Sequence, residues 1–199
     1  MAFGLPNISF IGYPVSLPCP GHAGMGLRQA RRPDAPAILA HFRELTDRDR
    51  RHRFCGTLSD AAVERHVDGL WPDGPLLIAA HDGPLWPGPF HAAGAVRALA
   101  EVSLSEGRAE LALTVDGSLR RRGVGTWLVR TAARLLAPRG IAHITAWTLP
   151  DNAAFLALSR RCDAEIAHEA GQVEVTFDVA ALHRAYLLRR TARAFGAAA

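Results

Sequence analysis

The sequence predicts one mixed α/β domain, and three observations support this fold class. The chain has 199 residues, 49% of them hydrophobic, and a mean hydropathy of +0.04, which is typical of one globular core with extensions. An alternating, strand-like segment at 111–115 is followed by a glycine-containing loop at 116–125 and by helical periodicity at 126–136. Segments of both periods also precede and follow this unit, so we expect strands and helices to form one layered domain over residues 26–179.

The elements before this central unit are predicted from turn and cap residues. Residues 1–25 are rich in proline and glycine without a sustained period, so we expect an extended or disordered arm. A short strand is expected at 27–31. The PDAP sequence at 33–36 favours the start of a helix that runs to about Leu45, and another helix is expected after the Ser-Asp pair at 59–60.

The remaining elements follow from alternation, breakers and turns. In chain order we expect paired strands at 76–81 and 91–99 around a loop at 82–90, a strand at 109–115, a strand at 142–148, a helix at 152–162 and a hairpin of strands at 164–169 and 173–178. The tail, residues 180–199, contains an amphipathic basic helix. Packing on the domain or formation of a homodimer is the expected role of this helix, in preference to membrane binding.

Composition excludes several classes of protein. No apolar run approaches the roughly 20 residues that span a membrane, and no secretory signal pattern opens the chain, so a cytoplasmic location is expected. Cys19, Cys55 and Cys162 lack metal-ligand spacing and are odd in number, and the nine histidines form no cluster, so neither a metal site nor a disulfide framework is expected. The net charge is +4, but all 23 basic residues are arginines scattered among acids, which argues against nucleic-acid binding.

The loop at 116–125 has the chemistry of an anion site. Arg120, Arg121 and Arg122 lead into Gly123-Val124-Gly125 just where helical periodicity begins at Thr126. Glycines let backbone N–H groups turn inward, and the first N–H groups of a helix have no partner within the helix and carry the positive end of its dipole. A diphosphate would bind there, with support from the arginines. The alternative is a flexible turn beside a solvated basic run.

Two motifs resemble the GNAT family of N-acetyltransferases. Arg120-x-x-Gly123-x-Gly125 resembles the family's Q/R-x-x-G-x-G/A signature. Asn152, with Phe155, Leu158 and Arg160 at the following offsets, resembles its N-x-x-M/A-x-x-L motif with a basic residue two positions on. Residues 27–167 further resemble the acetyltransferase domain of bacterial Pat-type protein lysine acetyltransferases, above all in LTDRDRRHRF at 45–54 and the segments around it.

The resemblance implies a fold, a cofactor and a set of binding residues. The fold would be a single GNAT-like domain whose mostly antiparallel mixed sheet is flanked by helices, with two strands splayed apart to admit acetyl-CoA. The diphosphate would lie on the loop and first helical turn, at Arg120, Arg121, Gly123, Val124, Gly125 and Thr126. The pantetheine arm would pair with the strand backbone near Val115 and with the side chain of Asn152. The charged segment 45–54 is then either a solvated helical turn or the rim of the acceptor site.

Glu110 is the predicted catalytic base. An amine of pKa about 10.4 must lose a proton before it can attack a thioester, which costs about 4.6 kcal/mol at pH 7. Glu110 begins the strand that leads into the loop, where family members often place a catalytic glutamate; its alternative is a solvent-facing strand residue. Glu101 and Glu106 are expected in or near the next connection and are therefore less favoured.

The sequence predicts acetyl transfer from acetyl-CoA to a primary amine, with a protein lysine or a small molecule as the acceptor. Ser159 stands where many relatives have a tyrosine that protonates the leaving thiolate, and a serine is a poor acid, so we expect water to protonate that thiolate. For the same reason a non-catalytic acyl-CoA-binding module stays open as an alternative.

Overall fold

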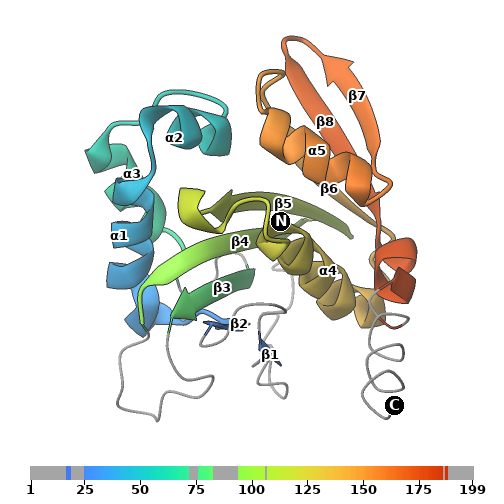
Figure 1. Ribbon diagram of the computed structural model, residues 1–199, viewed down its shortest axis with the longest axis horizontal. Helices are drawn as coiled ribbons and strands as arrows, with labels where there is room; N and C mark the ends of the chain where they lie inside the picture. Colours follow the sequence, from blue (N-terminus) through green and yellow to red (C-terminus); the bar gives the residue numbers. More distant parts are fainter. Residues whose placement is uncertain are drawn as a thin grey trace, which may run out of the picture.

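The computed structural model describes residues 17–18, 25–71, 76–82, 94–105, 107–185 and 187. Within these residues, one eight-stranded sheet carries helices on both faces (Figure 1). The strands lie in the order β1-β2-β3-β4-β5-β6-β8-β7, and only β5 and β6 are parallel neighbours. The predicted fold class is confirmed. The strand bounds are β1 Leu17–Pro18, β2 Met25–Gln29, β3 Leu76–Asp82, β4 Val96–Ser105, β5 Arg108–Val115, β6 His143–Thr148, β7 Glu165–Glu169 and β8 Gln172–Asp178.

Figure 1 shows α1, α2 and α3 at one end of the sheet, α5 with the β7–β8 hairpin at the other, and α4 between them. The helices form two groups, α1–α3 and α4 with α5. None of the described helices is long and apolar enough to span a bilayer. Residues 179–185 are also helical, whereas most of the predicted tail helix lies outside the described residues. The helix bounds are α1 Ala35–Glu44, α2 Asp47–Phe54, α3 Asp60–Asp68, α4 Val124–Leu136 and α5 Ala153–Arg161, with short 3-10 turns η1 Arg32–Asp34, η2 Gly117–Leu119 and η3 Ala137–Arg139.

Strand alternation assigns each helix group to a face of the sheet. On β4, Ala98 and Ala100 join the apolar core that contains α4 and α5, whereas Leu99 joins the core that contains α1 and α3. Successive strand residues point to opposite faces, so α4 and α5 share one face and α1 and α3 share the other. The side chains at odd positions of β4 from Leu99 onward therefore point towards α1–α3.

The parallel pair β5–β6 is short. Ladder partners are Ala109 with Ile144 and Glu110 with Thr145, although β5 continues to Val115 and β6 to Thr148. The two strands therefore part beyond Glu110, in agreement with the splayed pair that the sequence predicts.

Two strands differ clearly from their predicted bounds: the strand expected at 27–31 is β2, Met25–Gln29, and β4 differs more. β4 was expected at 91–99, but it runs from Val96 to Ser105, and residues 91–93 lie outside the described part of the chain. Its polar second half, Glu101 to Ser105, remains a strand because it pairs with β5 along its whole length. Glu101 therefore lies within the sheet and not in a connection, while Glu106 is outside the described residues.

The ends of the domain contain one element that was not expected. Leu17–Pro18, within the predicted arm, forms β1 and pairs with Leu27 and Gly26 of β2. The rest of the arm before Met25 lies outside the described residues, as do residues 83–90 of the predicted loop.

Candidate functional site

The turn between β5 and α4 leaves backbone donors free at the start of a helix. Gly123 is the N-cap residue, with φ of 85° and no side-chain cap. The first helical hydrogen bond is donated by the Trp127 N–H to the Gly123 carbonyl (2.9 Å). The N–H groups of Val124, Gly125 and Thr126 precede that bond and have no acceptor within the helix, which is the arrangement that binds anions.

The two glycines of the turn are required for different reasons. A Cβ at Gly123 would meet no atom within 4 Å, but its positive φ disfavours other residues. Gly125 is buried, and a Cβ there would lie 2.6 Å from Leu158 Cδ1 of α5 and 3.6 Å from Leu113 Cδ2 of β5. Gly125 therefore allows α4 to pack closely against its neighbours, a reason that the motif alone did not reveal.

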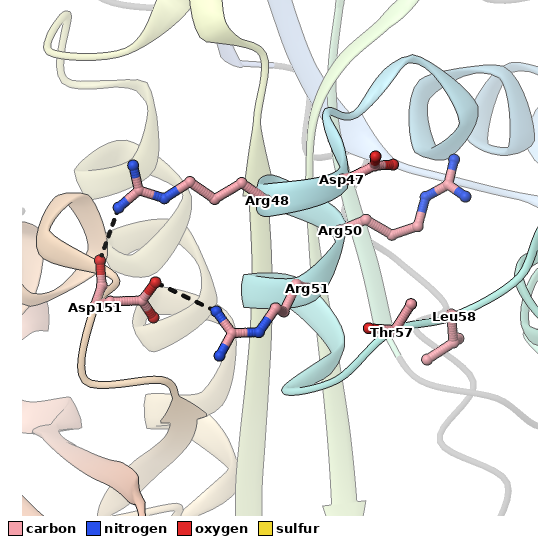
Figure 2. A pocket seen from close by; sticks show the side chains of 7 residues that line it. All are labelled: Asp47, Arg48, Arg50, Arg51, Thr57, Leu58 and Asp151. Atoms are coloured by element: carbon pink, nitrogen blue, oxygen red, sulfur yellow. Dashed lines mark hydrogen bonds and ion pairs between the residues drawn. The ribbon is translucent and has the colours of Figure 1, made fainter.

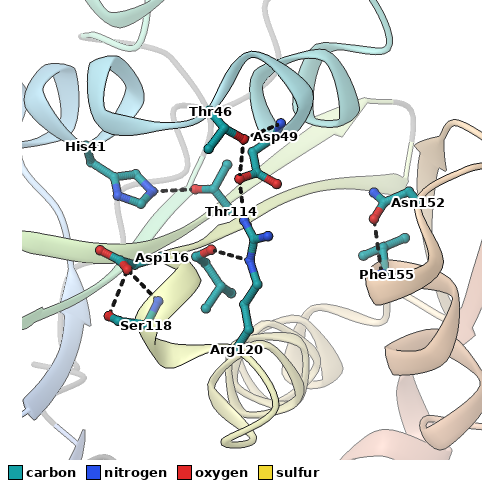
Figure 3. Close-up of polar contacts among 10 residues, drawn as sticks. His41, Thr46, Asp49, Thr114, Asp116, Ser118, Arg120, Asn152 and Phe155 are labelled. Carbon is teal, nitrogen blue, oxygen red and sulfur yellow. Dashed lines mark hydrogen bonds and ion pairs between the residues drawn. The ribbon is translucent and has the colours of Figure 1, made fainter.

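Arg120 contacts its own chain, whereas Arg121 and Arg122 are exposed. Its Nε donates to the Val115 carbonyl (3.2 Å), and its Nη2 lies 2.7 Å from Asp49 Oδ2 of α2 (Figure 3). Burial of the Asp49 carboxyl opposes its ionisation, but the hydrogen bond from Arg120 helps to hold its pKa below the ordinary value. Asp49 is a residue of this site that the sequence did not single out.

Asn152 lies on the other side of the gap between β5 and β6. It is the N-cap of α5: its Oδ1 accepts from the Phe155 N–H (3.2 Å) and its Nδ2 donates to Thr148 Oγ1 (2.8 Å). One Nδ2 hydrogen is not used in these bonds. Both residues were predicted to contact pantetheine: Val115 ends β5, and Asn152 follows the end of β6 and bonds to Thr148, its last residue.

Glu110 occupies the last paired position before the gap. It is exposed and lies opposite Ser103 of β4, which places its side chain on the face of the sheet that α1–α3 cover. Cys55, which ends α2, is near enough that the charge of Glu110 adds to burial in raising the pKa of its thiol. The predicted base therefore lies under α2, at the start of the gap.

Glu101 has an environment that the sequence did not predict. Its side chain is 5% exposed, and its carboxylate contacts Arg53 of α2 (2.5 Å) and His66 of α3 (3.0 Å). Burial opposes ionisation, but Arg53 and His66 outweigh it and hold the pKa of this carboxyl below its ordinary value. The Arg53 guanidinium also lies over the Phe54 ring, 4.6 Å from its centroid. Glu101 therefore anchors α2 and α3 to the sheet.

Two further polar groups near β5 are buried. His41 of α1 lies 2.8 Å from Thr114 Oγ1, and burial lowers the pKa of His41 to about 4, so the imidazole is neutral at pH 7. Ser159 is fully buried, and its Oγ donates to the Phe155 carbonyl (2.9 Å), which engages its one proton. Among the described residues, no group of three His, Cys, Asp or Glu side chains could hold a metal ion.

Comparisons with solved structures support the fold. The GNAT domain of S. lividans PAT matches with a TM-score of 0.64 and 21% identity, over 77% of this chain and 90% of that one. The ribosomal-protein-S18-alanine N-acetyltransferase from Escherichia coli matches with a TM-score of 0.56 and 17% identity, over 78% and 94%. A PaiA N-acetyltransferase from Thermoplasma acidophilum, solved in complex with coenzyme A, matches with a TM-score of 0.57 and 12% identity, over 77% and 98%.

The sequence itself carries the family relationship. No curated protein matches the chain. The model of the acetyltransferase (GNAT) family, however, matches residues 39–163, which is more than half of the 199 residues and includes both strands that part and the turn before α4. The chain therefore belongs to the acetyltransferase (GNAT) family, whose members are acyltransferases that use acetyl-CoA.

Proposed function

We propose that this protein transfers the acetyl group of acetyl-CoA to a primary amine, with Glu110 as the general base. The observation that carries this proposal is the position of Glu110, at the last rung before β5 and β6 part and on the face that α2 covers. Glu110 is thus beside the gap in which a thioester would lie. Because the side chain is exposed, it can reach an amine that enters from solvent.

The cofactor would enter along the turn before α4. The free N–H groups of Val124, Gly125 and Thr126 suit its diphosphate, and the exposed Arg121 can add a charge-assisted contact. Arg120 contributes by shaping this turn, since it joins the end of β5 to α2. Gly123 gives the turn its left-handed conformation.

The pantetheine arm would run between the parted strands. The backbone at Val115 lies on one side, and the remaining hydrogen of Asn152 Nδ2 can donate from the other. This route ends near Glu110, which brings the thioester and the base together. The 26–179 region would form this domain, with residues 1–25 and 180–199 as extensions.

The reaction would proceed by direct attack. Glu110 accepts a proton from the ammonium group, directly or through a water molecule, which offsets the cost of about 4.6 kcal/mol for making a lysine-like amine neutral at pH 7. The amine nitrogen then bonds to the thioester carbonyl carbon, and the C–S bond breaks. The CoA thiolate takes its proton from a water molecule, because the Ser159 hydroxyl is buried and donates elsewhere. That water molecule in turn receives the surplus proton of the attacking nitrogen, which leaves a neutral amide and CoA thiol.

A protein lysine is the acceptor that we favour. Glu110 begins a row that crosses four strands through Thr145 and Thr176 to Glu165, because these residues are ladder partners. Glu174 lies next to this row, opposite Trp147. The exposed carboxylates of Glu110 and Glu165 can pair with a cationic acceptor. The resemblance of residues 27–167 to Pat-type protein lysine acetyltransferases points the same way.

Glu110→Gln tests the proposed base. It keeps the side-chain shape but cannot accept a proton, so we expect turnover at pH 7 to fall by roughly 10²- to 10⁴-fold while the Kd of CoA stays near the wild-type value. Raising the pH should partly restore the rate, because more of the amine is already neutral. Steady-state pH–rate profiles and calorimetry with CoA would measure both effects.

Glu165→Gln is the matched control, since Glu165 is an exposed glutamate in the same row. It should leave turnover within a few-fold of the wild-type value. Equal losses in the two variants would remove the special role of Glu110. If thiol release stays at background for a panel of amines and lysine peptides while CoA binds, the protein is an acyl-CoA-binding module and not an enzyme.

A further inference from the structure

α2 is a helix without an apolar face. Seven of its eight residues, DRDRRHRF, are acidic, basic or histidine, and none of the eight is buried. Thr46 caps its first turn by accepting from the Asp49 N–H (3.2 Å), which explains why the segment is helical. Only Phe54, in the last turn, packs against the apolar core, where its ring centroid lies 5.6 Å from that of Phe42. Hydrophobic burial of the kind that holds α4 therefore does not explain where the rest of α2 lies.

Ionic contacts to four different elements determine the place of α2. Arg50 contacts Asp60 at the start of α3, and Arg53 contacts Glu101 of β4. Asp49 contacts Arg120 in the turn before α4, and the fourth contact is made to Asp151, immediately before α5. The last three attach α2 to the centre of the sheet and to both sides of the gap between β5 and β6.

The contact with Asp151 gathers three side chains of α2. Arg51 Nη1 lies 3.3 Å from Asp151 Oδ2, and Arg48 Nη2 donates to the backbone carbonyl of Asp151 (3.3 Å), as Figure 2 shows. His52 Nε2 lies 3.2 Å from Asp151 Oδ1. Arg51 and Asp151 are each about half exposed. A pocket of about 400 Å³ lies between these residues and the loop at 57–58.

We propose that α2 is an ionic strap across the gap and that Asp151 is a positioning residue, which acts through Arg51 and His52 to hold α2 where it shapes the acceptor side of the site. This inference rests on the proposed function. Glu110 lies beneath α2, so an amine approaching Glu110 passes this helix. A displacement of α2 at Asp151 would change the acceptor site, whereas the turn before α4 would remain.

The contacts of α2 with Asp151 are weak enough to break and form again in solution. The Asp151 carboxylate is exposed to solvent, and ion pairs of this kind are individually weak and screened by salt. Arg53 and Glu101, by contrast, are 9% and 5% exposed, and they hold the last turn of α2 against β4. The contacts with Asp151 are therefore the more easily broken of the two.

Asp151→Asn is the test, with Asp151→Glu as the conservative variant. Using acetyl-CoA and Nα-acetyl-lysine amide as probes, we expect Asp151→Asn to raise the KM of the amine about 3- to 10-fold, with kcat and the Kd of CoA within about 2-fold of wild type. Asp151→Glu should restore most of the amine KM. Raising NaCl from about 0.05 to 0.5 M should raise the amine KM of the wild type and change that of Asp151→Asn much less.

Hydrogen exchange provides a readout that does not depend on turnover. Amides of α2 should exchange faster in Asp151→Asn than in wild type, while amides of α4 should be unchanged. Glu64→Gln is the control, since it removes a half-exposed ion pair with Arg43 between α1 and α3, away from the gap. It should alter neither α2 exchange nor the amine KM.

The outcomes separate this inference from the proposed function. Faster α2 exchange with an unchanged amine KM would overturn the positioning role while leaving the enzyme assignment intact. Unchanged α2 exchange would overturn the strap itself. Absence of turnover in the wild type would defeat the proposed function and, with it, the positioning role, but exchange in α2 would still report whether Asp151 holds the helix.

Discussion

Two helices that border the gap between β5 and β6, α4 and α2, are held in place by different forces. α4 buries nine of its thirteen residues, among them Leu128 and Leu136, in the larger apolar core. α2 buries none and depends on ion pairs with β4, the turn before α4 and the start of α5. The helix that carries the anion-binding turn is thus fixed by packing, whereas the helix above Glu110 is fixed by charge.

The buried polar groups follow the same division. Among the described residues, the buried polar side chains on the α4–α5 face carry neutral hydroxyl groups: Thr131, Thr148 and Ser159. The α1–α3 face contains the titratable His41 and Glu101. Apolar packing is insensitive to salt and pH, while buried charges respond to both neighbours and protons. This difference makes the acceptor side the adjustable part of the molecule.

The largest expected effect tests the charged anchor. Glu101→Gln leaves the Arg53 guanidinium, 9% exposed, without its counter-charge, so we expect the free energy of unfolding to fall by about 3–5 kcal/mol. Urea unfolding at pH 7 would measure it. Glu64→Gln, which breaks an exposed pair, should cost less than about 1 kcal/mol. Equal costs would mean that the buried pair is no more important than a surface one.

The next largest effect is a loss of stability at low pH that arises from His41. Burial lowers the pKa of His41 from 6.5 to about 4, so between these values the unfolded chain binds the proton more readily than the folded protein. The contribution of the neutral His41 side chain to the free energy of unfolding is therefore complete above pH 6.5. It falls by about 3 kcal/mol in all as the pH falls towards 4.

His41→Gln isolates this contribution, because it keeps a hydrogen-bonding group near Thr114 but does not titrate. The difference in unfolding free energy between wild type and variant should shrink as the pH falls from about 7 to 4.5, since other groups titrate in both proteins. Urea unfolding at several pH values would measure it. A constant difference would show that His41 is not the titrating group.

Apolar periodicity made the α4 side predictable from sequence. The strand at 109–115 begins one residue before its expected start, and the helix ending at Leu136 begins two residues before, because each buries residues at its own period. Asn152 was likewise expected to begin a helix, and it caps α5. These features depend on neighbours in the sequence.

The α2 side was less predictable because its contacts join distant segments. In TDRDRRHR acids and bases alternate without a face, so nothing local indicates that Asp49 contacts Arg120 or that Arg51 contacts Asp151. Glu101 was expected near a connection because serines and another glutamate follow it. Its burial arises from Arg53 and His66, which α2 and α3 supply. Charge pairs formed by folding have no periodic signal in a single sequence.

The smallest effect concerns the packing of α4 against α5. Gly125→Ala would place a Cβ 2.6 Å from Leu158 Cδ1, so we expect overpacking to cost about 1–3 kcal/mol of unfolding free energy and to weaken CoA binding by displacing the turn. In a Leu158→Ala background that contact is absent, and the same substitution should cost at least about 0.5 kcal/mol less. Urea unfolding of the four proteins and calorimetry with CoA would measure both quantities.

This double-mutant cycle of Gly125→Ala and Leu158→Ala distinguishes two reasons why the motif has a glycine at position 125. If packing is the reason, Leu158→Ala should also relieve the loss of CoA affinity that Gly125→Ala causes. If the Cβ itself blocks the diphosphate, that loss will persist in the double variant. Gly123→Ala supplies the contrast, because its Cβ meets no atom and its cost comes from a φ of 85°; Leu158→Ala should not relieve it. If Leu158→Ala also restored the CoA affinity that Gly123→Ala loses, Leu158 would act by loosening the whole turn and not through its contact with Gly125.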